Sequence, residues 1–147
     1  MFHSIAIQKR KNHQNDKGII KYSETVTKEK LYLMNMFPIQ AAFFNRRLFL
    51  ENGGFDTSLK LLEDWDLWIR YHESGRFKLV NKVTSIYFVP GEYIERKKRY
   101  KQLKSYTTVI RKKHNISDNQ LKEFKKNNLI TMKEKVITKV RNRIMYL

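Results

Sequence analysis

The sequence changes character near residue 90, and this change limits the possible folds more than any other feature. Up to that point, short apolar stretches typical of strands alternate with helical patterns, whereas helix signals dominate from Glu92 onward. Residues 1–90 hold 14 lysines and arginines against nine acids, net +5, and residues 91–147 hold 17 against five, net +12. The sequence predicts an α/β part, residues 1–90, and a basic helical extension, residues 91–147.

The composition supports a protein with a core of its own. Of the 147 residues, 41% are hydrophobic, which is enough to bury one. The absence of cysteine excludes disulfides, thiolate metal sites and a cysteine nucleophile, and agrees with a reducing compartment. Apolar runs such as Ile39–Phe44 are far shorter than the ~20 residues of a membrane span. We expect a cytoplasmic protein, with a basic charge that suits a peripheral position on the inner face of the cell membrane.

Turn and cap residues divide the first part of the chain. Two β-compatible stretches flank the turn residues Asn15–Gly18, which predicts a hairpin that begins at Phe2. Thr27 is placed to cap a short helix, Lys28–Met34.

The next segment follows a breaker. Pro38 ends the preceding helix, and the apolar run Ile39–Phe44 predicts a buried strand. Asn45 is expected to cap the helix Arg46–Asn52, and the glycine pair that starts at Gly53 supplies its C-terminal stop.

A second, stronger helical pattern covers Glu63–Ser74 and ends before Gly75. Its apolar face has the i, i+3, i+4, i+7 spacing of Trp65, Trp68, Ile69 and His72. Two short strands are expected on either side of Asn81 and Lys82. The extension then predicts one helix to about His114 and, after a break capped by Ser117, a second from about Asp118.

The first turn of the helix Glu63–Ser74 contains three acids, Glu63, Asp64 and Asp66. Acids at this position stabilise a helix by ~0.3–1 kcal/mol each through the macrodipole, which is one explanation. A functional alternative is that Trp65 forms a platform for a sugar or base and raises the pKa of a neighbouring carboxylate. Asp64 and Asp66 spell Asp-x-Asp, but residues i and i+2 of a helix point about 200° apart, which disfavours a shared metal ion.

The segment from Phe37 to Phe88 resembles the second half of a family 2 glycosyltransferase of the GT-A fold. The shared elements are an apolar strand, a basic helix start, a Gly-Gly-Phe-Asp turn at Gly53, the Glu-Asp pair of Glu63 and Asp64 before an aromatic-rich helix, a glycine and two strands. The resemblance covers roughly residues 1–90 and leaves out the basic extension.

This resemblance implies an inverting sugar transfer from a nucleotide-sugar donor to the hydroxyl of a glycan or lipid-linked acceptor, as in the synthesis of cell-surface polysaccharides. Asp64 would be the general base that deprotonates the acceptor hydroxyl. Glu63 would hold the acceptor or orient the base, and Trp65 would stack against a sugar ring.

The family's donor-binding half comes earlier in the chain and ends in an Asp-x-Asp that holds a divalent cation, Mg²⁺ or Mn²⁺. No such strand-plus-acids element precedes Phe37, and Asp66 lies on the acceptor side of the Gly-Gly-Phe-Asp turn. The cation ligands are therefore expected outside this chain. The sequence fits a fragment, a truncated gene product or half of a split enzyme, inactive alone.

Other readings remain open at this stage. A non-catalytic basic interaction or nucleic-acid-binding module is the main alternative, although most aromatic residues lie in apolar-periodic positions and not among the lysines. A degenerate remnant of the enzyme is a third. Residues 118–147 include an apolar stripe from Met132 to Leu147, which predicts either packing on the domain or contact with an anionic membrane surface.

Overall fold

The computed structural model describes residues 1–21 and 24–127. Its sheet contains β1 (Phe2–Arg10), β2 (Ile19–Lys21), β3 (Ala42–Phe43) and β4 (Lys78–Val89). β4 pairs with β1 in parallel along the whole length of β1, while β2 and β3 pair antiparallel with its two ends. The fold is thus α/β with a mixed sheet, in which β1 is the central strand.

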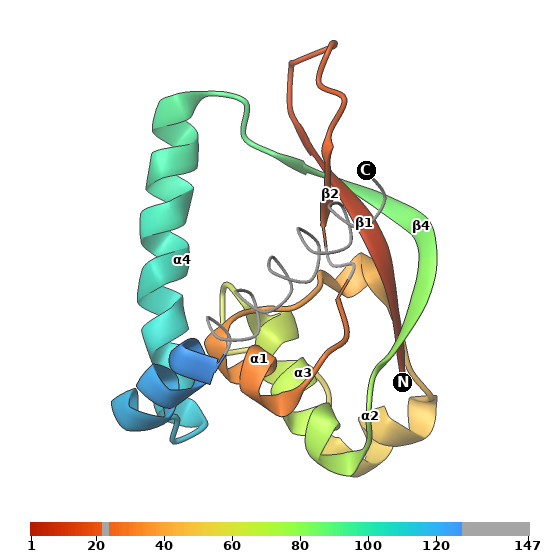
Figure 1. The fold of residues 1–147 in the computed structure, drawn as a ribbon, viewed down its shortest axis with the longest axis vertical. Helices are drawn as coiled ribbons and strands as arrows, with labels where there is room; N and C mark the ends of the chain where they lie inside the picture. Colours follow the sequence, from red (N-terminus) through yellow and green to blue (C-terminus); the bar gives the residue numbers. More distant parts are fainter. Residues whose placement is uncertain (22–23, 128–147) are drawn as a thin grey trace, which may run out of the picture.

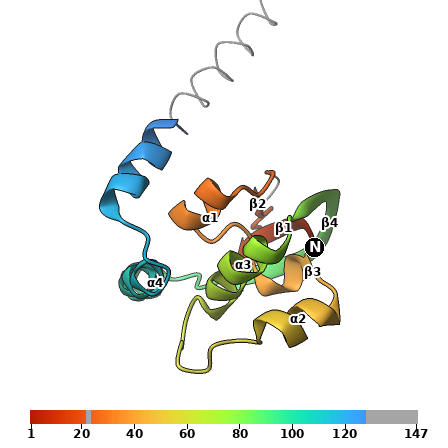
Figure 2. The same ribbon diagram turned by 90° about the horizontal axis from the view of Figure 1, so that it is seen from below.

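The helices lie at one end and along one side of this sheet. They are α1 (Lys28–Leu33), α2 (Arg46–Asn52), α3 (Glu63–Ser74) and α4 (Tyr93–Lys113), followed by a helical stretch at residues 118–127. Figures 1 and 2 show α1, α2 and α3 together near the N-terminal end of β1, with the hairpin loop at the opposite end of the molecule. The long helix α4 runs back from the far end of β4 and meets α1 and α3 at its own C-terminal end.

Local capping confirms most of the expected helix boundaries. Thr27 Oγ1 accepts a hydrogen bond from Lys30 N at 3.3 Å, and Asn45 Oδ1 accepts one from Arg47 N at 2.8 Å. Gly53 ends α2 with a φ of 74°, a left-handed conformation that favours glycine. The expected hairpin is also present, since β1 and β2 pair antiparallel.

The expectation of a buried strand over Ile39–Phe44 is wrong for most of its length. Ile39–Ala41 forms one turn of 3-10 helix after Pro38, and only Ala42 and Phe43 pair with β1. Ala41 is buried, whereas Ile39 and Phe43 are exposed. Pro38 supplies a φ of −80° at the start of the turn, and a short apolar run does not by itself distinguish a strand from a helical turn.

The two strands expected around Asn81 and Lys82 are one continuous strand, β4. Ser4 pairs with Val80 but Ile5 pairs with Val83, so the register shifts across this dipeptide. The interruption in the sequence pattern therefore marks a β-bulge inside a strand and not the end of one.

The core is aromatic and lies between β1 and α3. The Phe37 ring stacks on the His3 imidazole at 4.8 Å and meets Trp68 at 4.9 Å and Phe77 at 4.8 Å. Such ring pairs contribute ~0.5–1.5 kcal/mol each beyond their buried area. Three residues of the basic extension, Ile110, Ile116 and Leu121, belong to the same cluster of buried residues as Trp68.

The helical stretch at residues 118–127 begins with a reciprocal cap. Ser117 Oγ accepts from Gln120 N at 3.2 Å, and Gln120 Oε1 accepts from Ser117 N at 2.9 Å, which confirms Ser117 as the N-cap. The apolar stripe Met132–Leu147 lies outside the described residues. Within residues 1–21 and 24–127, no helix combines the length and the apolar character that crossing a membrane requires.

Candidate functional site

The candidate site lies at the N-terminus of α3, where Leu62 precedes the first helical residue, Glu63. Leu62 adopts a left-handed conformation, with φ of 63° and ψ of 24°, and its side chain caps nothing. The acids that follow therefore supply the negative charge that the helix N-terminus favours. The three acids have different surroundings.

Asp64 is half-buried, and one of its two carboxylate oxygens is held by hydrogen bonds from other residues. Its Oδ1 accepts a hydrogen bond from Asn35 Nδ2 at 3.0 Å and another from Trp65 N at 2.8 Å. Burial raises the pKa of Asp64 and the nearby charge of Glu63 adds to this rise, whereas hydrogen bonds from Asn35, the Trp65 amide and the amide of Asp64 itself oppose it. The hydrogen bonds from Asn35 and Trp65 both reach Oδ1, so this oxygen is held in place by two other residues.

Glu63 is the first residue of α3 and is half-buried beside Asp64. Its charge disfavours ionisation of Asp64, as just described. Because the two residues are consecutive in the chain, their proximity follows from the sequence and not from the fold.

Trp65, the third residue to which the resemblance gives a role, belongs to the core. Its side chain is 1% exposed, and its Nε1 donates to Leu31 O at 2.6 Å. A sugar ring needs an accessible aromatic face, and Trp65 presents none in this structure. The stacking role expected for Trp65 is therefore not supported, and Trp65 acts by fixing α3 against α1.

Asp66 is fully buried and turns toward α4. Its Oδ2 lies 3.1 Å from Arg70 Nε, and its Oδ1 lies 2.8 Å from both Lys113 Nζ and His114 Nε2. Burial raises the pKa of Asp66, but the bonds from His114 and Lys113 outweigh it, so that the pKa falls to about 2. The carboxylate serves as a charged anchor for the end of α4.

The Asp-x-Asp string therefore does not form a shared cation site. Asp64 contacts Asn35, whereas Asp66 contacts the end of α4. Over the described ranges, no group of three or more histidine, aspartate or glutamate side chains is arranged to hold a metal ion.

The Gly-Gly-Phe-Asp turn is fastened to α3 by Arg70. The guanidinium donates from Nη1 to Asn52 O and from Nη2 to Gly54 O, each at 2.6 Å, and Tyr71 Oη donates to Gly53 O at 3.0 Å. The pieces that carry the resemblance thus pack against one another. Sequence reasoning missed Arg70, although its position four residues after Asp66 is the spacing of a helical ion pair.

Asn35 was also missed, and no sequence signal points to it. It follows α1 and reaches Asp64 across a separation of 29 residues. Only the packing of α1 against α3 creates this contact.

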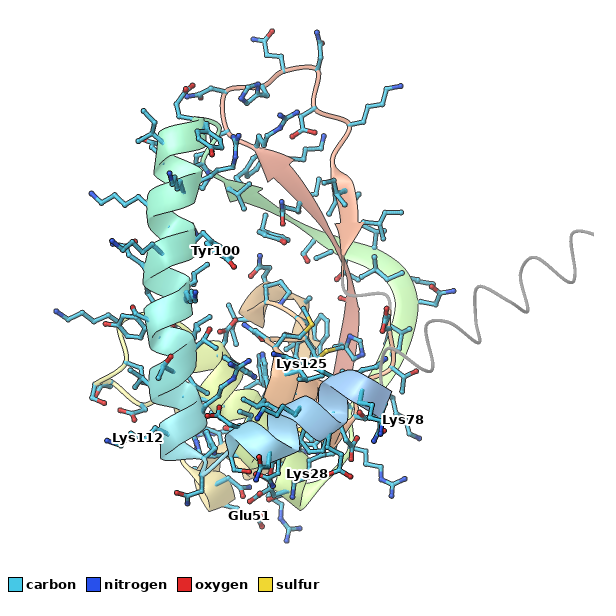
Figure 3. The ribbon with its side chains drawn as sticks, turned by 60° about the vertical axis from the view of Figure 1, so that its left-hand side comes forward. Lys28, Glu51, Lys78, Tyr100, Lys112 and Lys125 are labelled. Atoms are coloured by element: carbon cyan, nitrogen blue, oxygen red, sulfur yellow. The ribbon has the colours of Figure 1, made fainter. Side chains whose placement is uncertain are left out.

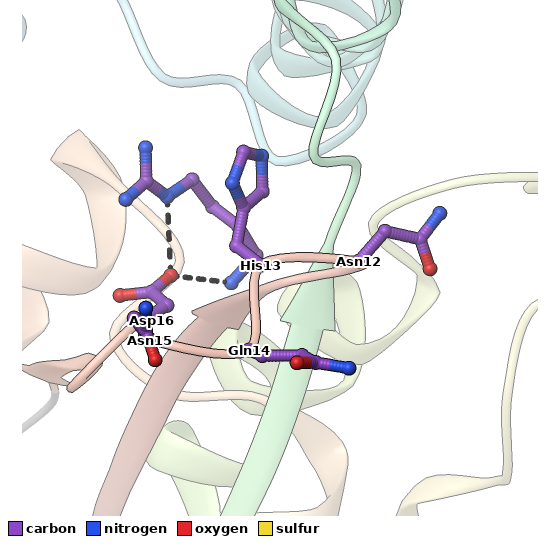
Figure 4. A pocket seen from close by; sticks show the side chains of 6 residues that line it. Asn12, His13, Gln14, Asn15 and Asp16 are labelled. Atoms are coloured by element: carbon purple, nitrogen blue, oxygen red, sulfur yellow. Dashed lines mark hydrogen bonds and ion pairs between the residues drawn. The ribbon is translucent and has the colours of Figure 1, made fainter.

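An open depression is present at the hairpin loop (Figure 4). It is lined by Arg10 and residues 12–16, at the end of the molecule away from α3. Asp16 Oδ2 accepts from Arg10 N at 2.8 Å and from Arg10 Nε at 3.1 Å, and Asp16 Oδ1 accepts from Gly18 N at 3.0 Å. These bonds close the turn, so they explain Asp16 without a ligand.

Comparisons with protein-family models, characterised proteins and solved structures found no match to this chain.

Proposed function

We propose that the chain is the acceptor-side part of an inverting glycosyltransferase, with Asp64 as its general base. The observation that carries this proposal is the state of the Asp64 carboxylate. The Asn35 side chain and the Trp65 amide both orient Oδ1, and burial raises the pKa of the carboxyl group. A carboxylate with these properties suits proton abstraction better than one used only to cap a helix.

In the proposed reaction, Asp64 takes the proton of an acceptor hydroxyl while the hydroxyl oxygen attacks the anomeric carbon of a nucleotide-sugar. The new C–O bond forms on the face opposite the departing diphosphate, which leaves with the electron pair of the broken bond. The configuration at carbon is inverted. General-base help of this kind contributes ~10²–10⁴-fold in rate. Glu63 is placed beside the base and is the proposed contact for the acceptor.

The described residues do not fit the divalent cation that the complete enzyme would use. Asp66 is engaged by Arg70, Lys113 and His114, and Asp64 already accepts two hydrogen bonds on one oxygen. We therefore assign the binding of the cation and of the donor diphosphate to a polypeptide segment other than residues 1–21 and 24–127.

The sheet offers a place for such a segment. β4 pairs with β1 along one edge, and no other strand pairs with it in the described chain. Ile86 and Phe88 project from this strand with 51% and 57% of their surfaces exposed. Folded proteins normally cover an open strand edge, which presents unpaired backbone groups, and also a sheet face with exposed apolar side chains. This supports a second polypeptide layer against β4, which we assign to donor binding.

The test is sugar transfer with the donor-binding polypeptide fused or added to the full chain. A panel of nucleotide-sugars is offered with oligosaccharide and lipid-linked acceptors. We expect no turnover by the chain alone, turnover in the combined protein, near-complete loss with Asp64→Asn and a milder loss with Glu63→Gln. Full activity of Asp64→Asn would reduce the three acids to a helix-capping role.

A further inference from the structure

Helix α4 has one packed face and one open face. Four residues spaced as neighbours on one face are partly or fully buried: Arg96, Leu103, Thr107 and Ile110. The opposite face holds Ile94 and the lysines at positions 97, 98, 101, 104 and 112, which are all exposed. We call these six residues the lysine face. In Figure 3, Lys112 extends from α4 into solvent.

The lysines of the lysine face form no ion pair within the described residues. Within the described residues, none of its five lysines lies within 4.0 Å of a carboxylate, whereas Lys113, on another side of the helix, pairs with Asp56 and Asp66. Glu95, the single acid of α4, is about 100° around the helix from Ile94. The face is therefore a row of unpaired positive charge about 20 residues long.

Exposed apolar groups accompany these lysines at the start of α4. Ile94 is 79% exposed, and Tyr93 and Tyr100, which lie about 100–120° around the helix from Ile94, are 68% and 70% exposed. Lysines beside isoleucine and tyrosine suit the boundary of a lipid bilayer, where the apolar groups enter the headgroup region and the ammonium groups remain at the phosphates.

The residue types favour lipid over nucleic acid. Reading of bases depends largely on arginine, which forms paired hydrogen bonds with guanine and with phosphate. The lysine face has five lysines and no arginine. An exposed isoleucine also gains nothing from a phosphate backbone, whereas it gains from burial among acyl chains.

The next helical stretch, residues 118–127, is less suited to this role than the sequence suggested. Its apolar residues are turned toward the domain: Leu121 is buried, and the Phe124 ring lies 5.9 Å from the ring of Tyr32. Both α4 and residues 118–127 have exposed lysines, but the exposed isoleucine and tyrosines that accompany them are on α4.

We propose that the lysine face of α4 is a docking surface for an anionic phospholipid membrane. The anchoring of the C-terminal end of α4 at Asp66 holds the face in a fixed orientation relative to α3. This inference does not depend on the proposed transferase activity, because it rests on α4 alone.

The experiment is co-sedimentation of the full chain with vesicles of phosphatidylcholine, with and without phosphatidylglycerol. One variant carries Lys97→Gln, Lys101→Gln and Lys104→Gln. A matched control carries Lys122→Gln, Lys125→Gln and Lys126→Gln, so that both lower the net charge from +17 to +14. Circular dichroism verifies that both fold. A third variant, Ile94→Ser, removes the apolar contact.

We expect binding only to the anionic vesicles, falling with added salt, and lowered on the order of tenfold or more by the α4 triple variant. The control should lose much less, and Ile94→Ser should weaken binding even at low salt. Equal losses in the two triple variants would overturn the proposal, because only total charge would then matter. Equal binding to neutral vesicles would overturn it, and so would an α4 triple variant that loses affinity for duplex DNA but not for anionic vesicles.

Discussion

The His114 imidazole Nε2 lies 2.8 Å from Asp66 Oδ1, which joins the end of α4 to a carboxylate buried in α3. Lys113 Nζ reaches the same oxygen at 2.8 Å, and Arg70 Nε holds the other oxygen at 3.1 Å. One carboxylate therefore joins Arg70 of α3 to Lys113 and His114 at the end of α4. Because the Asp66 side chain is fully buried, removing its charge is expected to be costly.

Asp66→Asn should destabilise the protein by about 3 kcal/mol, because it leaves Arg70 and Lys113 without the buried anion that they share. Urea unfolding measures this loss. Asp56→Asn is the matched control, since Asp56 also contacts Lys113, at 2.6 Å, but is 29% exposed. We expect about 1 kcal/mol or less for the control. A similar loss of stability in both variants would contradict the prediction, because the buried carboxylate of Asp66 would then contribute no more than the partly exposed one of Asp56.

The free energy of unfolding should decrease at acid pH because Asp66 becomes protonated. The pKa of Asp66 is lowered in the folded state from 3.8 to about 2, so below pH 4 the unfolded chain binds more protons than the folded protein. The contribution is complete above about pH 4 and is lost as the pH falls toward 2, with a size of roughly 2 kcal/mol. Unfolding of wild type and Asp66→Asn between pH 2 and about pH 5 checks this: the gap between the two should narrow as the pH falls.

Asp64→Asn should have the opposite pH signature. Because burial raises the pKa of Asp64, the folded protein holds the proton more tightly than the unfolded chain, and ionised Asp64 reduces stability as the pH rises above the unfolded value. Asparagine removes this penalty, and its oxygen still accepts from Trp65 N. Relative to wild type, the variant should gain stability between pH 4 and pH 7, as measured by urea unfolding.

Glu63→Gln serves as the control for that comparison. It removes a charge from the same helix turn, so a loss of about 0.3–1 kcal/mol is expected from the helix dipole alone. If Asp64→Asn loses stability between pH 4 and pH 7 relative to wild type, the raised pKa of Asp64 is contradicted.

Both tryptophans should behave as core residues in fluorescence. Trp65 is 1% exposed and Trp68 is fully buried, so emission should be blue-shifted and resist quenching by iodide. Trp65→Phe removes the donor to Leu31 O and should cost about 1–3 kcal/mol by leaving a buried carbonyl unpaired. Efficient iodide quenching that disappears in Trp65→Phe would instead indicate an accessible sugar-binding ring.

The helix boundaries follow from local chemistry, which explains why the sequence predicts them well. Caps at Thr27, Asn45 and Ser117, and the stop at Gly53, act over a few residues and can be recognised without a fold. The partners of the candidate site are different. Asn35 and Asp64 are 29 residues apart, so their contact depends on how α1 and α3 pack.

Trp65 shows how a correct pattern can be misread. Its spacing from Trp68 and Ile69 placed it on the apolar face of α3, and the structure buries all three. The acids on either side of Trp65 suggested a binding platform, but adjacent residues of a helix point about 100° apart and need not share surroundings. Periodicity was the better guide here than adjacency.

The pairing of β1 with β4 also determines the order in which the chain acquires structure. Phe2 pairs with Lys78 and Arg10 with Val89, so β1 stays without its longest neighbour until nearly 80 more residues have been made. Until then its partners are the three residues of β2 and the two of β3. Contacts so distant in sequence slow folding, because a long loop must close before they form. During synthesis, β1 is therefore an apolar segment without its main pairing strand. In a chain that stops before β4, β1 can instead associate with other nascent chains.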